Sequence, residues 1–201
     1  TKSGVAADAK AVGDIFTANF TASDGLQFKF GKDGDGNYGY YGADGSLVPF
    51  RCYYKVPYAT LSANLKNGSM TTNQYDGSYG FSCSGTVSKV SSASYCGTKF
   101  TMDITNYDTL YFAYRKEKDH GQLTAVIYKT DGTMEQALTN SYHTNSTTWS
   151  MYKIDLSGIK GTRTILLHGG YVDSTGSSSS LSYFSCIYLS RGGTPPSNSW
   201  V

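Results

Sequence analysis

The chain has 201 residues, which suits one sizeable globular domain with an appendage and is short for two full-sized domains. Lys and Arg total 17 against 15 Asp and Glu, and charged residues make up only 16% of the chain. This balance excludes a polybasic nucleic-acid binder and an acidic disordered tail. No run approaches the roughly 18 apolar residues of a membrane-spanning helix, so we expect no membrane insertion.

The composition favours β-structure. The chain holds 18 Tyr and 23 Gly, and aromatic residues make up 14% of it. Aromatic side chains suit a pleated sheet, and glycine opens tight turns. Glutamate, a strong helix former, occurs only at Glu117 and Glu135. We therefore expect an all-β protein.

Residues 3–16 are the exception, because their apolar residues have a helical spacing. The stripe consists of Val5, Ala9, Val12 and Phe16. An isolated helix of this length is marginal in water, so it is expected to pack against its own domain or against identical copies around an axis.

A small β-meander is predicted next. Its strands are expected at 26–30, 37–41 and 46–50, separated by Gly- and Asp-rich turns. Pro49 marks the last strand as an edge, because proline cannot donate a ladder hydrogen bond. Three such strands bury little, so this unit too is expected to lean on a neighbour or a symmetry mate.

The main domain is predicted between residues 66 and 190. Apolar or alternating runs separated by turn residues lie at 78–87, 99–104, 109–115, 122–129, 148–156, 162–170 and 180–190. Such spacing without intervening helices predicts two packed antiparallel sheets, and a jelly roll rather than a closed barrel. The full expected organisation is a helical connector (1–20), a meander (21–58), a jelly-roll β-sandwich (66–190) and a tail (191–201).

No cofactor or metal site is predicted. Gly34, Gly36 and Gly39 match G-x-G-x-x-G, but an aromatic strand follows instead of the helix that a dinucleotide site requires. The aspartates of the same stretch resemble a calcium loop, yet Tyr38 takes the position that requires glycine. The four cysteines form no zinc-binding spacing.

We also predict no catalytic role. The chain has no G-x-S-x-G elbow, and none of its three histidines, His120, His143 and His168, lies in a recognisable catalytic motif. A catalytic depolymerase stays open as an alternative, with carboxylates drawn from Asp103, Asp155 and Asp173.

Two polar and aromatic segments, 141–149 and 169–180, are the candidate ligand-binding loops. Aromatic faces stack on the C–H surfaces of sugars, while amide, carboxylate, hydroxyl and imidazole groups form hydrogen bonds with their hydroxyls. The predicted ligand-binding residues are Tyr142, His143, Asn145, Trp149, Tyr171 and Asp173. Strand-end packing is the alternative role for the two tyrosines.

Segments 3–14 (SGVAADAKAVGD) and 32–50 (KDGDGNYGYYGADGSLVPF) resemble a helix and hairpin of tail-fibre and baseplate-associated proteins of phages and prophages of Gram-positive bacteria. The resemblance covers about a quarter of the chain. It implies a homotrimeric connector, with Val5, Ala9, Val12 and Phe16 in the threefold seam and other tail or baseplate proteins as partners. It also implies a location in the virion tail after assembly in the bacterial cytoplasm, and a distal β-domain that recognises the host surface.

Two hypotheses follow from the sequence. The first is a structural and adhesive tail protein whose jelly roll binds a host cell-surface glycan. The second is a monomeric secreted carbohydrate-binding module of a polysaccharide-degrading system.

Because the resemblance implies assembly in a reducing cytoplasm, we expect reduced and mostly buried cysteines. Cys83 and Cys96 are the pair that strand neighbourhood could bring close enough to bridge.

Overall fold

The structure is a computed structural model that describes residues 19–21, 27–32, 38–41, 47–49, 52–72, 74–117, 122–139, 147–172 and 180–191. The chain divides into two compact units, Thr1–Arg51 and Cys52–Val201. The predicted helix with its four stripe residues lies outside the described residues, as does the C-terminal tail beyond residue 191.

The first unit contains a four-stranded antiparallel meander. Its strands are β1 (Asn19–Thr21), β2 (Gln27–Lys32), β3 (Tyr38–Tyr41) and β4 (Leu47–Pro49), in the order β1-β2-β3-β4. Three of them agree with the predicted strands. Pro49 pairs with Gly39 in β4, an edge of this sheet, as the missing N–H of proline predicts.

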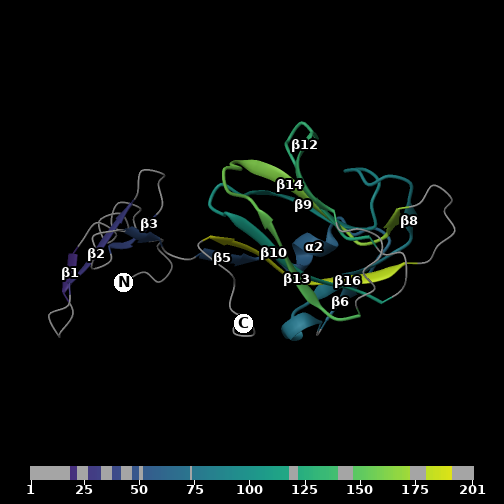
Figure 1. Cartoon of the computed structure of the whole chain (residues 1–201), viewed down its shortest axis with the longest axis horizontal. Helices are drawn as coiled ribbons and strands as arrows, with labels where there is room; N and C mark the ends of the chain where they lie inside the picture. The colour runs from purple at the N-terminus through teal and green to yellow at the C-terminus, as the bar shows by residue number, and fades with distance from the viewer. Residues whose placement is uncertain are drawn as a thin grey trace, which may run out of the picture. The chain divides into compact units, whose positions relative to one another are not determined.

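The second unit is a sandwich of two sheets (Figure 1). The six-stranded sheet has the order β13-β10-β16-β7-β6, and β5 also pairs with β16. Its strands are β5 (Cys52–Lys55), β6 (Met70–Thr71), β7 (Gly80–Ser84), β10 (Thr109–Lys116), β13 (Ser150–Asp155) and β16 (Leu181–Arg191). The four-stranded sheet has the order β12-β11-β14-β9, with strands β9 (Gly97–Asp103), β11 (Thr124–Tyr128), β12 (Met134–Thr139) and β14 (Thr162–His168).

The described part of this unit contains four further short elements. The helix α2 (Tyr58–Ser62) buries Leu61, and the 3-10 turn η1 (Tyr75–Gly77) lies between β6 and β7. A two-residue parallel pair joins β8 (Thr86–Val87) to β15 (Tyr171–Val172). Among the described residues, no helix is long and apolar enough to cross a membrane.

Alternating side chains build the core between the two sheets. Leu110, Phe112 and Tyr114 of β10 point inward, and Ile165 and Leu167 of β14 meet them from the other sheet. Phe184 of β16 lies at the centre of an aromatic cluster, with ring centroids 5.0 Å from Phe81, 5.6 Å from Phe112 and 5.0 Å from Tyr114. This period-two pattern is the one that predicts strands in the sequence.

The all-β, jelly-roll-like sandwich predicted from the sequence is confirmed. After β7 the chain passes repeatedly from one sheet to the other, which is the connectivity of a jelly roll. Two details differ. Residues 52–55 pair with β16 of the sandwich, whereas we placed them in the meander. Strand β12 is absent from the predicted strands because its sequence, MEQALT, consists mainly of good helix formers.

Candidate functional site

Trp149 belongs to a row of side chains across the outer face of the six-stranded sheet. The core-facing residues of β10 alternate with outward ones, so Arg115 points away from the core. Tyr183 of β16 is the direct partner of Arg115. Ser150 pairs with Tyr114, and this register places Trp149 opposite Arg115 on the other side. Strand pairing thus aligns three residues that are far apart in sequence.

The guanidinium group of Arg115 is held by the two aromatic rings of this row. Its Cζ lies 5.2 Å from the ring centroid of Trp149 and 4.4 Å from that of Tyr183. Both distances are within the range of cation–π attraction. Tyr75 of η1 extends the row, with its ring centroid 5.9 Å from that of Trp149. We name Tyr75, Trp149, Arg115, Tyr183 and Glu117 the aromatic row.

Glu117 adds a hydrogen-bond acceptor to the aromatic row. One of its carboxylate oxygens lies 3.8 Å from Nη1 of Arg115, and the side chains of Arg115 and Glu117 are 23% and 43% exposed. Burial raises the pKa of Tyr183, and its side-chain hydrogen bond to Glu117 raises that pKa further. The surface therefore combines aromatic faces, a fixed donor group and an exposed acceptor.

Of the other predicted ligand-binding residues, the structure describes only Tyr171. Tyr171 is half-buried in β15, next to β8, and lies outside the aromatic row. Tyr142, His143, Asn145 and Asp173 lie outside the described residues. Trp149 is in contact with the ring of Tyr75 and with the guanidinium group of Arg115.

Sequence reasoning missed Arg115, Tyr183 and Tyr75. Arg115 and Glu117 belong to a run of mixed charges at 115–121, and Tyr183 belongs to an apolar strand. Their outward position in β10 and β16 follows from alternation, so that signal was present in the sequence. The sequence carried no signal for the strand register that joins these residues to Trp149.

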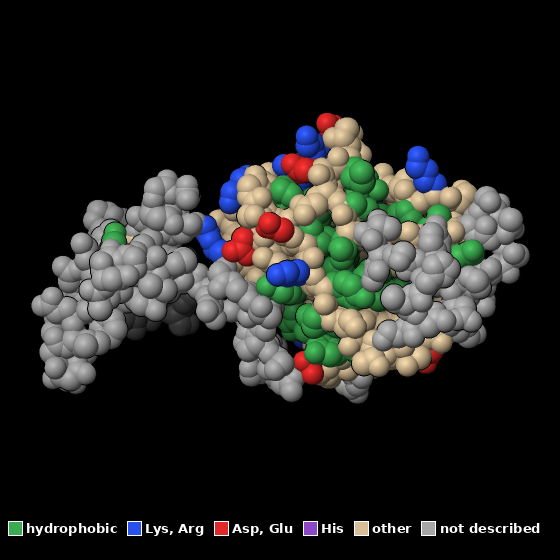
Figure 2. Space-filling model, viewed as in Figure 1, with side chains coloured by type: hydrophobic (Ala, Val, Ile, Leu, Met, Phe, Trp, Pro, Cys, Tyr) green, Lys and Arg blue, Asp and Glu red, His purple; other side chains and the backbone are tan. Residues whose placement is uncertain are grey.

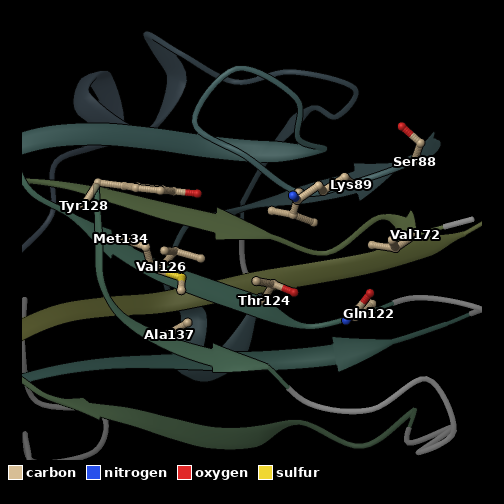
Figure 3. Close-up of a pocket in the computed structure, with 10 residues that line it drawn as sticks. Ser88, Lys89, Gln122, Thr124, Val126, Tyr128, Met134, Ala137 and Val172 are labelled. Carbon is tan, nitrogen blue, oxygen red and sulfur yellow. The ribbon is translucent and has the colours of Figure 1, made fainter. Parts of the chain in front are cut away.

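A second feature is a groove on the outer face of the four-stranded sheet, shown in Figure 3. Val126 and Tyr128 of β11 and Ala137 of β12 line it from the sheet, and Ser88 and Lys89 line it from the segment after β8. Gln122, Thr124 and Val172 lie toward one end, opposite Tyr128 and Met134 (Figure 3). The groove encloses about 250 Å³.

A small second core holds one wall of this groove in place. Val90 and Tyr95 pack against Val126, Tyr128 and Leu166 on the outer face of the sheet. The parallel pairing of β8 with β15 brings Val172 close to the same wall. Segments from three parts of the sequence therefore form the groove.

The carboxylates proposed for the catalytic alternative have structural roles where they are described. Asp103 accepts hydrogen bonds from the backbone and hydroxyl of Thr105, and Asp155 accepts the same pair from Ser157. These hydrogen bonds lower the pKa of both carboxyl groups, whereas a general acid needs a raised one. Within the described ranges, no cluster of three or more His, Cys, Asp or Glu side chains is arranged to hold a metal ion.

Comparisons with known proteins identify similar structures but no family. No family model matches the chain, and no curated protein matches it. The chain is similar to a mutant of a family 29 carbohydrate binding module, with a TM-score of 0.40 and 10% identity over 70% of this chain and 92% of that one. It is also similar to the family 11 carbohydrate-binding module from Clostridium thermocellum, solved with a mixed-linked tetrasaccharide, with a TM-score of 0.37 and 11% identity over 69% and 87%.

A third similar structure is the isomalto-dextranase of Arthrobacter globiformis T6 complexed with panose. Its TM-score is 0.43 and its identity 15%, over 71% of this chain and 24% of the enzyme. These TM-scores and identities are too low to transfer a ligand or a binding residue to this chain. The function must therefore be inferred from the residues of the chain itself.

Proposed function

We propose that the protein binds a glycan through the aromatic row on its six-stranded sheet. The observation that carries this proposal is the in-register alignment of Trp149, Arg115 and Tyr183, with the carboxylate of Glu117 3.8 Å from the guanidinium group. A half-buried Trp next to a paired donor and acceptor is an arrangement that recognises a sugar ring.

The pairing of Arg115 with Glu117 favours an uncharged sugar. Two adjacent hydroxyls of a pyranose each donate and accept, so one can accept from the guanidinium group while the other donates to the carboxylate. The apolar face of the ring then stacks on Trp149. Figure 2 shows basic and acidic side chains interspersed on the face in view, with no large area of one sign among the described residues. At the aromatic row, the carboxylate of Glu117 offsets the charge of the Arg115 guanidinium group, so a strongly charged polymer gains little there.

The test is binding of the full chain to an array of neutral and charged glycans, followed by calorimetry with the best oligosaccharide. Trp149→Ala should weaken binding at least about tenfold, and Glu117→Gln and Arg115→Lys should weaken it to a similar extent. Trp149→Phe, which keeps a stacking face, should retain most of the affinity.

Tyr58→Ala is the matched control, because Tyr58 of α2 is a 46% exposed aromatic residue outside the aromatic row. It should bind as tightly as the wild type. Equal affinity of Trp149→Ala, Arg115→Lys and the wild type, with unchanged circular dichroism, would refute the proposal.

Attachment of a phage or prophage particle to its host is the setting that we propose for this binding. The resemblance of residues 3–14 and 32–50 to tail proteins supports it, as does the division of the chain after Arg51 into a small meander unit and a larger sandwich. The secreted, monomeric carbohydrate-binding module is the alternative, and the sandwich alone suits it equally well.

Mass photometry of the wild type and of Val12→Asp separates these two settings. The proposed trimer should dissociate, since three like charges would meet in one seam. A wild type that is monomeric at micromolar concentration contradicts the tail proposal and leaves glycan binding in place.

A further inference from the structure

Two buried side-chain oxygens at one end of the groove, one of Gln122 and one of Thr124, have no hydrogen-bond partner among the described residues. Gln122 is 8% exposed and Thr124 5%, and both line the groove. The side-chain oxygen of each is buried without a partner in the described part of the chain. Figure 3 shows both side chains toward the end of the groove that Val172 borders.

Partnerless buried polar atoms are costly and uncommon. Leaving a buried donor or acceptor unpaired costs the desolvation of that group, and native proteins pair the large majority of them. Replacing Thr124 or Gln122 by an apolar residue of the same shape would avoid this cost. Two such groups that lie close together in a groove indicate that a bound ligand supplies their hydrogen bonds.

The rest of the groove defines which ligand group fits. Val126, Ala137 and Val172 contribute apolar surface, and no acidic residue lines the groove among the described residues. Gln122 Oε1 can only accept a hydrogen bond, while the Thr124 hydroxyl can donate or accept. A matching group offers an N–H donor and a C=O acceptor on opposite edges, as a trans amide does, together with a small apolar end, so that it fits between the two side chains.

We propose that this groove is a second binding site, which takes the acetamido group of an N-acetylated amino sugar. The amide N–H donates to Gln122 Oε1, the amide oxygen accepts from the Thr124 hydroxyl, and the methyl group rests on Val126 and Ala137. Ser88 and Lys89, on the wall that faces β11, are placed to reach hydroxyls of the sugar ring.

The volume and the setting favour a sugar over a peptide. A groove of about 250 Å³ lies below the roughly 300–1,000 Å³ of sites for drug-sized ligands, so it suits one monosaccharide unit with its substituent. The choice of a sugar rests on the proposed glycan binding. The inference of an amide rests on the groove alone.

The experiment compares four ligands by NMR titration and calorimetry of the full chain. They are the N-acetylglucosamine trimer, the deacetylated glucosamine trimer, a glucose trimer and N-acetyl-alanine methylamide. We expect the acetylated trimer to bind at least about tenfold more tightly than the deacetylated and glucose trimers, with the largest shifts at Gln122, Thr124 and Ala137.

Two isosteric variants test the polar contacts without risk to folding. Thr124→Val and Gln122→Met should lower affinity for the acetylated trimer about tenfold or more, while Tm stays equal or rises, because each variant removes an unpaired buried group. A purely structural role of the two side chains would leave the affinity unchanged.

The outcomes distinguish this proposal from the first. Trp149→Ala should leave acetamido binding intact, and Thr124→Val should leave binding at the aromatic row intact. Equal binding of the glucose and acetylated trimers to the Trp149→Ala variant, no binding of the acetylated trimer at millimolar concentration, or unchanged affinity of both isosteric variants overturns the acetamido site. Equal binding of the blocked alanine amide overturns the choice of a sugar.

Discussion

The backbone N–H of Cys96 donates a hydrogen bond of 2.9 Å to Nδ1 of His168, although the two residues are 72 positions apart. This contact assigns the proton of the neutral imidazole to Nε2. His168 is fully buried at the end of β14, where it pairs with Gly97 and Thr124. Burial lowers the pKa of His168 to about 4, and a backbone contact with Gly170 opposes this only in part.

We therefore predict a loss of stability in mild acid. The pKa of an unfolded histidine is about 6.5, so between pH 6.5 and 4 His168 is protonated in the unfolded state and neutral in the folded state. The contribution of His168 to the free energy of unfolding is complete above pH 6.5 and falls by about 3 kcal/mol as the pH drops to 4. Urea unfolding at pH 7, 5.5 and 4.5 measures it.

His168→Gln is the control for this prediction, because glutamine does not titrate. The variant should lose most of the dependence between pH 6.5 and 4. Asp103 and Asp155, whose pKa values are lowered, act only at more acidic pH. An unchanged pH slope in His168→Gln would show that another group causes it.

A substitution of Gly97 should be severe. Its φ is 141°, and an added Cβ would lie 2.1 Å from the carbonyl oxygen of Leu167 in the neighbouring strand. Gly97→Ala is expected to lower the free energy of unfolding by about 3 kcal/mol, through backbone strain and displacement of β9 from β14. Gly132→Ala, at φ 83° with open space around it, should cost only about 1 kcal/mol. Equal effects in chemical denaturation would contradict this argument.

The cysteines should react as free thiols. Cys83 and Cys96 are buried and Cys186 is half-buried, and none of the three forms a disulfide. The structure has no bond between Cys83 and Cys96, the pair that strand neighbourhood could bring together, and the redox state of the cysteines stays a prediction. Burial raises the pKa of the Cys83 thiol well above its usual value.

Alkylation followed by intact-mass measurement checks this prediction. Without reductant, denatured protein should take up four labels. In the native protein, Cys83 and Cys96 should react much more slowly than Cys186, because burial hinders both access and thiolate formation. Fewer than four labels in denaturant would indicate a disulfide and favour the secreted module.

Asp103 and Asp155 should prove structural. Asp103→Ala and Asp155→Ala remove the turn hydrogen bonds to Thr105 and Ser157 and should lower Tm modestly. Both variants should bind glycan like the wild type. Release of reducing sugar from host cell wall by the wild type, lost in either variant, would support the depolymerase alternative instead.

Local sequence pattern was enough to determine the β-rich class, most strands of the sandwich and the edge position of Pro49. Alternation reports which residues face one side of a strand, and proline cannot donate at any position, so both signals are local. The choice of Trp149 as a binding residue also came from local composition. The set of six predicted ligand-binding residues as a whole stays a prediction.

Only the tertiary structure decided which residues lie together. Arg115 meets Trp149 and Tyr183 because the register of three strands aligns them, and register depends on long-range pairing that no local pattern encodes. The groove depends on the pairing of β8 with β15, because this pairing places Lys89 and Val172 beside residues of β11. Strand β12 has the residues of a helix and becomes a strand by pairing with β11, because tertiary contacts outweigh intrinsic propensity.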